Sequence, residues 1–153
     1  DAVEFALWMH DSVYIAHIRP QGLPSSDMYS AGFADNLLRF SQVSMAFREK
    51  VFRLIMATTH ERSMATSQDE KLIADIDWSS VGSPWTIFLD NRGKIRREYS
   101  EYTDAEFREG RIAWLKKYEN GMQFHLPDFF HRFATRAREN IKQELAMYES
   151  GEL

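Results

Sequence analysis

The sequence predicts a helical protein folded as one domain. Its 153 residues suffice for a single domain with a buried core, and 44% of them are hydrophobic and 14% aromatic. In several stretches apolar residues recur at three- and four-residue spacing, the period of an amphipathic helix. Helix start and stop signals flank these stretches, and only residues 83–100 leave a helix and a hairpin both open.

The chain begins with an apolar run that ends at an adjacent His and Asp. The run lacks Gly and Pro and fits a buried helix, with apolar residues at Phe5, Ala6, Leu7 and Met9. His10 and Asp11 follow, and an imidazole and a carboxylate bind a divalent metal ion when both are deprotonated. A buried carboxylate needs a positive partner, which a metal ion would supply. By itself, however, a His-Asp pair is more often a helix end with a solvated Asp.

Two helices are expected next. Residues 15–27 contain the Pro and Gly residues typical of a loop, and Ser25, Ser26 or Asp27 is expected to cap a helix over about 28–38. A further helix over about 44–59 is indicated by apolar and small residues at helical spacing, namely Ala46, Phe47, Val51, Leu54, Ile55 and Thr58.

His60 stands at the end of this second helix and has two interpretations. It is a candidate for contacting a substrate or supporting a metal ligand. It is almost equally typical of a helix-end His favoured by the helix dipole. Residues 63–68 then have the composition of a polar loop.

A helix over about 69–79 carries two aspartates. We expect Leu72, Ile73 and Ile76 to face inward. Asp75 and Asp77 are two residues apart, so their side chains point about 200° from one another and only one of them can face a given site. Spacing alone favours two ordinary surface acids.

Residues 83–100 fit two structures. Trp85, Ile87 and Leu89 alternate before a turn-like Asp90–Gly93, as in a β-hairpin. Ser83-Pro84 is instead a good helix start, and a helical face is formed equally well by Trp85, Phe88, Leu89, Ile95 and Tyr99.

Two more helices end the chain. Thr103–Glu106 has the form of a capping box, and Gly121 closes the helix that follows. Pro127 fits a first helical turn and Gly151 marks the far end of the last helix. That helix carries one apolar stripe, formed by Phe130, Phe133, Ala134, Ala137, Ile141 and Leu145.

Composition excludes several classes of function. The net charge of -4 gives no electrostatic basis for binding nucleic acid. Cysteine is absent, so a metal site must use N and O ligands, and this absence fits a reducing cytoplasm. No apolar run reaches roughly 18 residues, so no membrane span is expected, and no signal peptide opens the chain. Because Asp1 leads straight into the first apolar run, we expect an N-terminal element of a longer protein to precede it.

Taken together and in order, several segments resemble the HD-domain metal-dependent phosphohydrolases, specifically the group of predicted HD-superfamily phosphohydrolases. The first is Ala6–Tyr14, which is similar to that group's aromatic-His-Asp-x-Val-Tyr segment. The others follow along nearly the whole chain, at Ser30-Ala31, Leu54–His60, Asp75–Asp77, Ile95–Tyr99, Gly110-Arg111, Ala137–Ile141 and Glu144-Leu145.

The resemblance implies an all-α fold, a single HD-like helical bundle that holds a divalent metal ion. The first ligand would be a His upstream of the present sequence, followed by His10 and Asp11. The last ligand would be Asp77, with Asp75 as the second choice. Imidazole and carboxylate ligands suit Mn, Fe, Co or Ni, and Zn or Mg is also compatible.

The same resemblance implies hydrolysis of a phosphate ester, with nucleotides the expected class, by a metal-activated water. Asp11 would be a second candidate for orienting that water, and His60 is the other catalytic candidate. Arg96 or Arg111 could hold the phosphate bidentately, although a structural ion pair, such as Arg96 with Glu98, is the simpler interpretation.

The sequence departs from the family pattern in two ways. It lacks the helix with the first His, and Asp27-Met28-Tyr29 precede Ser30-Ala31 where the group has Asn-Glu, so we interpret Met28 as replacing that Glu. The alternative function is therefore a binding or scaffold protein that kept the HD fold and lost the chemistry. A nucleic-acid binder is disfavoured by charge, and a homodimer is left open.

Overall fold

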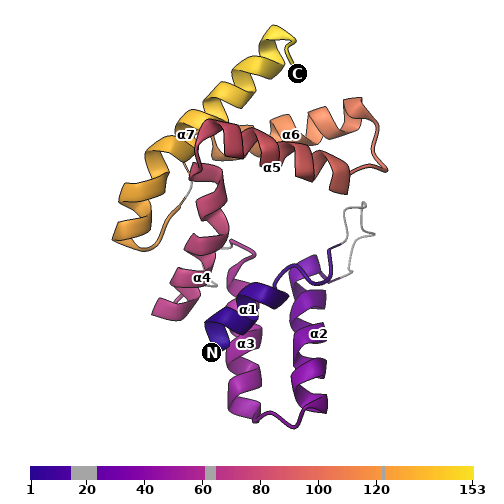
Figure 1. Ribbon diagram of the computed structural model, residues 1–153, viewed down its shortest axis with the longest axis vertical. Coiled ribbons are helices and arrows are strands. Elements are labelled where there is room, and N and C mark those ends of the chain that lie inside the picture. The colour runs from indigo at the N-terminus through magenta and orange to yellow at the C-terminus, as the bar shows by residue number, and fades with distance from the viewer. Residues whose placement is uncertain (15–23, 61–64, 122) are drawn as a thin grey trace. The chain divides into compact units, whose positions relative to one another are not determined.

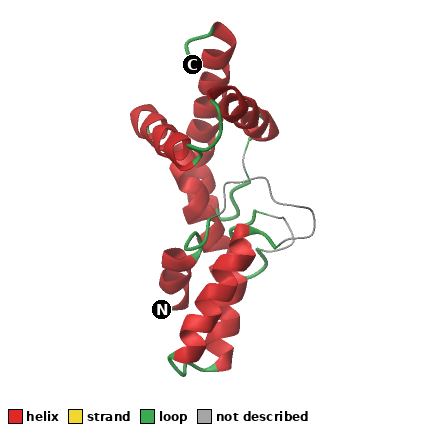
Figure 2. Cartoon of the chain, turned by 90° about the vertical axis from the view of Figure 1, so that its right-hand side faces the viewer, coloured by secondary structure: helices red, strands yellow, loops and turns green. Residues whose placement is uncertain are grey.

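The computed structural model describes residues 1–14, 24–60, 65–121 and 123–153, and in these ranges it is helical and contains no strand (Figure 2). The all-α prediction is therefore confirmed. The elements of Figure 1 are α1 (Ala2–Met9), α2 (Ser26–Phe40), α3 (Met45–Ala57), α4 (Gln68–Ser79), the 3₁₀ turn η1 (Ser80–Gly82), α5 (Trp85–Glu98), α6 (Asp104–Tyr118) and α7 (Pro127–Ser150).

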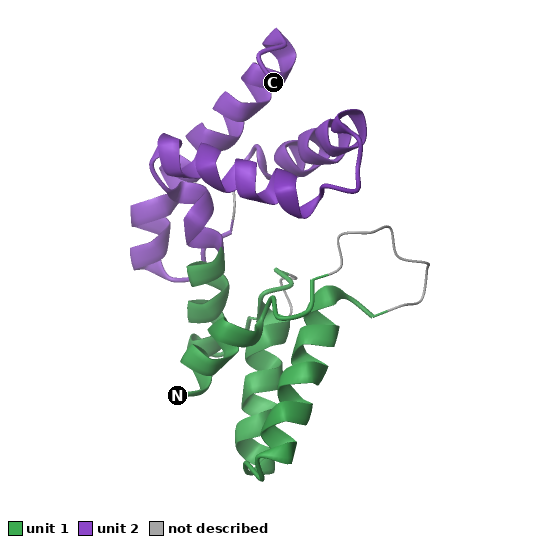
Figure 3. Ribbon diagram, turned by 45° about the vertical axis from the view of Figure 1, so that its right-hand side comes forward, with its two compact units in different colours: residues 1–77 green, residues 78–153 purple. Residues whose placement is uncertain are grey.

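Contacts within the chain group it into two compact units, Asp1–Asp77 and Trp78–Leu153 (Figure 3). Each unit has a hydrophobic core of its own. The organisation as one HD-like domain stays a prediction beside this grouping. Among the helices described, none is long and apolar enough to cross a membrane.

Local sequence signals set several helix ends. Ser25 proves to be the cap of α2, since its hydroxyl accepts a hydrogen bond from the N–H of Met28. Thr103 and Glu106 form the predicted capping box of α6. Pro127 occupies the first turn of α7, and Gly151 ends this helix in the left-handed conformation with a φ of 78°.

The hairpin alternative for residues 83–100 is wrong, because Trp85–Glu98 is the continuous helix α5. The rings of Trp85 and Phe88 stack at 5.5 Å on successive helical turns, and Phe88 is buried. Lys94 pairs with Asp90 at 2.7 Å one turn earlier, so the turn-like residues lie within the helix.

The core of the first unit lies where α1 and α3 meet α2 and α4. Alanines of α1 and α2, Ala6 and Ala31, are completely buried, and small side chains let the helices approach closely. The predicted face of α3 is confirmed by Leu54 and Ile55, which are also buried. On α4 Ile73 is buried as expected, but Leu72 and Ile76 are only half-buried and Ala74 is buried beside Ile73 instead. Figure 1 shows α2 and α3 side by side along their lengths.

The core of the second unit is built on α7. Most of its predicted stripe is buried against α6, but Phe130 is 51% exposed and does not belong to the core. The side-chain amide of the buried Asn140 donates to the carbonyls of Val81 and Ser83, at 2.8 and 2.9 Å. These two hydrogen bonds attach η1 to α7.

Candidate metal centre

Two histidines of the first unit contact the carboxylate of Asp77, and a second aspartate, Asp11, lies beside one of them. The Nε2 of His60 donates to the Oδ2 of Asp77 at 2.7 Å. The Nε2 of His10 lies 3.4 Å from the Oδ1 of Asp77 and 3.4 Å from the Oδ2 of Asp11. The structure thus brings together His10, Asp11, His60 and Asp77, which we call the His-Asp cluster.

The cluster depends on which face of α4 each aspartate occupies. Asp77 points to the two histidines, and its side chain keeps 30% of its surface exposed. Asp75, two residues earlier, is completely buried in the same helix. The two carboxylates therefore have different surroundings, as their angular separation requires.

His60 reaches Asp77 through an unusual backbone conformation. α3 ends at Ala57, and the hydroxyls of Thr58 and Thr59 donate to carbonyls of its last turn, at 2.7 and 2.9 Å. His60 then adopts a φ of 57°, the left-handed region that side chains other than Gly rarely occupy. Such a conformation costs on the order of 1–3 kcal/mol and is concentrated at functional sites.

The ring of His10 is oriented as in metal-binding histidines. Its Nδ1 lies 2.8 Å from the carbonyl oxygen of Leu7, and because a carbonyl can only accept, Nδ1 carries the proton. In the neutral ring the lone pair is then on Nε2, which faces Asp11 and Asp77. A backbone carbonyl that fixes the far nitrogen is the usual support of a histidine ligand.

Without a metal ion, His10 and Asp77 shift one another's pKa values. The hydrogen bond with Asp77 raises the pKa of His10 to about 9, against the opposing effect of burial and with further help from the charge of Asp11. Burial raises the pKa of Asp77, but hydrogen bonds from His10 and His60 outweigh it and bring the pKa to about 2. At neutral pH the metal-free cluster therefore holds an imidazolium against an ionised Asp77.

The segment after Asp11 is anchored to α2. The backbone N–H of Val13 donates to the hydroxyl of Ser30 at 3.0 Å, and the same hydroxyl donates back to the carbonyl of Val13 at 3.2 Å. Ser30 is completely buried. This pair of bonds holds the segment after Asp11 against α2.

Sequence reasoning missed Asp27. This residue lies in the first turn of α2, one helical turn before Ser30, and its charge acts on Asp11. Burial raises the pKa of Asp11 most, His10 opposes this, and the charges of Asp77 and Asp27 raise it further. From the sequence, Asp27 is expected only as a possible helix cap, and Met28 is interpreted as replacing the Glu that the HD group has before its Ser-Ala. The useful signal was the three-residue spacing from Asp27 to Ser30, which puts both on one helical face.

The predicted substrate-binding arginines belong to the second unit, and protein groups hold both. Arg96 pairs with Asp104 at 2.7 Å, rather than with Glu98 as expected, and also donates to the carbonyls of Tyr99 and Tyr102. Arg111 binds the buried carboxylate of Glu144 bidentately, at 3.0 and 2.8 Å. A role for either arginine in binding substrate stays a prediction.

The donor set of the cluster fits a first-row divalent ion, because it combines imidazole nitrogens with carboxylate oxygens. Its present distances are those of hydrogen bonds and ion pairs. In the described part of the chain, no three His, Asp or Glu side chains have the arrangement of an ion-holding group. Comparison with known protein families, curated proteins and solved structures finds no match to this chain.

Proposed function

We propose that this chain is a metal-dependent phosphohydrolase of the HD type, acting on a phosphate ester and most suitably on a nucleotide. The observation that carries the proposal is that the carboxylate of Asp77 meets His10 and His60, with Asp11 alongside. These residues come from three places in the sequence, and Nδ1 of His10 donates to the carbonyl of Leu7 one helical turn earlier, which leaves Nε2 facing the two aspartates.

In this proposal His10, Asp11 and Asp77 hold the metal. A bound divalent ion would bring the pKa of a water toward neutrality and polarise a phosphoryl oxygen. Before the ion binds, the Nε2 of His10 must lose its proton. Binding therefore releases a proton from His10.

The other groups have supporting roles. His60 donates to one oxygen of Asp77 and so orients the carboxylate toward His10. Asp11 has a raised pKa, which makes it a better proton acceptor than an ordinary aspartate, and this suits the orientation of an attacking water. Asp27 adds negative charge next to Asp11 and increases the attraction for a cation.

The experiment measures metal binding and hydrolysis in the same samples. The chain is stripped with EDTA, titrated calorimetrically with Mn²⁺, Co²⁺ and Ni²⁺, and assayed for phosphate release from a panel of nucleotides. We expect Asp77→Asn to abolish both signals. Asp90→Asn is the matched control, since Asp90 is an exposed acid paired with Lys94 and should leave both unchanged.

Two further results bear on the proposal. His60→Gln should weaken metal binding about 10–100-fold, the usual effect of removing a group that orients a ligand. A wild-type chain that binds none of the three ions and hydrolyses no nucleotide would overturn the proposal.

The alternative is a binding or scaffold protein with the same fold. It is favoured by the mutual pairing of His10, His60 and Asp77, which already satisfies the cluster without a cation. For this alternative, Asp77→Asn would change stability but neither metal content nor partner binding.

A further inference from the structure

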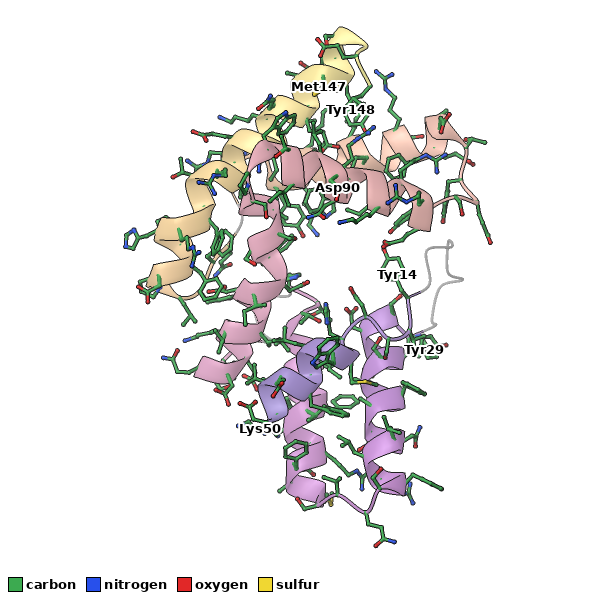
Figure 4. The ribbon with its side chains drawn as sticks, viewed as in Figure 1. Tyr14, Tyr29, Lys50, Asp90, Met147 and Tyr148 are labelled. Carbon is green, nitrogen blue, oxygen red and sulfur yellow. The ribbon has the colours of Figure 1, made fainter. Side chains whose placement is uncertain are left out.

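A pocket of about 460 Å³ lies within the second unit, among side chains of α5, α6 and α7. This volume is in the range of small-molecule sites. Three arginines line it, Arg92 from α5, Arg96 from the end of α5 and Arg108 from α6. Tyr148 of α7, labelled in Figure 4, also lines this arginine pocket, and the rest of its lining is Asp104, Ala105, Phe107 and Leu153.

Tyr148 holds two of the guanidinium groups. Its side chain is buried, and its phenolic oxygen accepts hydrogen bonds from Nε and Nη2 of Arg92, at 3.2 and 3.0 Å. Its backbone carbonyl accepts from Nη2 of Arg108. Both guanidiniums also lie over the tyrosine ring, at 5.4 and 5.5 Å from its centroid. A neutral residue thus fixes two positive charges beside one pocket.

The carboxylates nearby are too few to neutralise these arginines. Glu144 is shared, since it pairs with Arg92 at 3.2 Å and with Arg111 at 2.8 Å. Asp104 pairs with Arg96. Among the described residues, Arg108 has no carboxylate within ion-pair distance. Four arginines against two carboxylates leave this group of side chains with an excess of two positive charges.

Hydrogen-bond donors remain available for an anion. Arg92 uses Nε and Nη2, and Arg108 uses Nη2, so within the described residues the Nη1 groups of both make no hydrogen bond. Arg108 is also exposed to solvent. The planar fork of arginine matches phosphate oxygens geometrically, and a phosphate monoester carries up to two negative charges near neutral pH.

We propose that the arginine pocket binds a phosphate group against Arg92 and Arg108, either as free phosphate or as the phosphate of a small organic ester. This site is separate in composition from the His-Asp cluster and needs no metal ion. It therefore goes beyond the phosphohydrolase proposal.

The test is calorimetric titration of the full chain in EDTA with three probes: inorganic phosphate, AMP and adenosine. We expect phosphate and AMP to bind and adenosine, which carries no phosphate, to give no signal. Tighter binding of AMP than of phosphate identifies an organic ester as the ligand, and equal binding identifies phosphate itself.

Variants locate the binding. Arg108→Gln should weaken AMP or phosphate binding at least about tenfold, because it removes charge-assisted hydrogen bonds. Lys116→Gln is the matched control, an exposed cation on the same helix outside the pocket, and should bind as the wild type does. Asp77→Asn should also leave binding unchanged, which separates this site from the metal centre.

Arg108→Lys keeps the charge but not the fork, and we expect an intermediate affinity. Circular dichroism and thermal unfolding establish that each variant is folded. The proposal is overturned if the wild type binds neither phosphate probe, or if folded Arg108→Gln binds them as tightly as the wild type.

Discussion

Asp77 is the residue on which the His-Asp cluster depends, because one carboxylate pairs with two imidazoles. In the metal-free chain, Asp77→Asn should lower the pKa of His10 from about 9 toward 6.5, since the hydrogen bond with Asp77 is the main cause of the raised value. Titration of the imidazole protons by NMR measures this change. Asp11→Asn should lower the same pKa by less, because Asp11 acts only through its charge.

The raised pKa of His10 also fixes the sign of a stability effect. A group whose pKa is higher in the folded state stabilises it fully below pH 6.5 and ceases to do so as the pH rises through about 9. The free energy of unfolding of the metal-free wild type should therefore contain a component that declines between these values. An identical profile in Asp77→Asn would contradict this account.

Ser30 is the residue that holds the segment after Asp11 in place. Ser30→Ala removes both hydrogen bonds with Val13 at a completely buried position, so we expect a loss of about 1–3 kcal/mol in the free energy of unfolding. Urea denaturation measures it. Ser12→Ala, an exposed neighbour in the same segment, should cost much less, and equal losses would argue against an anchoring role.

At the level of helices, Gly82 shows how closely η1 packs on α7. A Cβ at this position would lie 2.7 Å from the Cβ and from the carbonyl oxygen of Phe133. Because backbone atoms cannot move aside cheaply, Gly82→Ala should cost about 1–3 kcal/mol in thermal or urea unfolding.

Gly110 provides the matched control for this prediction. It lies within α6, and a Cβ there would meet no heavy atom within 4 Å. Gly110→Ala should therefore be neutral or stabilise the protein by up to about 1 kcal/mol, because alanine favours the helix. If both substitutions had the same effect, close packing at Gly82 would not be its cause.

Helix ends could be predicted from the sequence wherever a capping residue or a terminal glycine sets them. Ser25, the capping box at Thr103 and Gly151 all act on the nearest backbone groups, so their effect is visible in the sequence. Residues 83–100 could not be assigned in this way. There the apolar residues fit a helical and an alternating period equally well, and Phe88 becomes buried only through tertiary packing.

The site was less predictable than the helices. A family resemblance suggested His10, Asp11 and Asp77, but spacing alone favoured surface acids for Asp75 and Asp77. In the contact of His60 with Asp77, His60 has a left-handed backbone conformation after α3. No glycine at this position indicates such a conformation in the sequence. Likewise the partner of Arg96 is Asp104, across a loop, and not the nearby Glu98. Contacts of this kind follow from tertiary structure.

For the whole molecule, the main feature is that the two candidate sites and the two hydrophobic cores are divided between the two units. The His-Asp cluster belongs to Asp1–Asp77 and the arginine pocket to Trp78–Leu153, while α4 contains the boundary. The buried residues of the first core run from Ala2 to Ala74 and those of the second from Trp78 to Tyr148. Each candidate site is therefore supported by a different core.

This division predicts where a core substitution acts. Leu115 is completely buried in the second core, so Leu115→Ala should cost about 2–5 kcal/mol through the cavity it leaves. Hydrogen exchange should then lose protection in residues 78–153 and retain it in α3. Leu54→Ala, at a buried position of α3, should give the reverse pattern. Equal loss of protection in both units for both variants would mean that the two cores unfold as one, and the two sites would then share their stability.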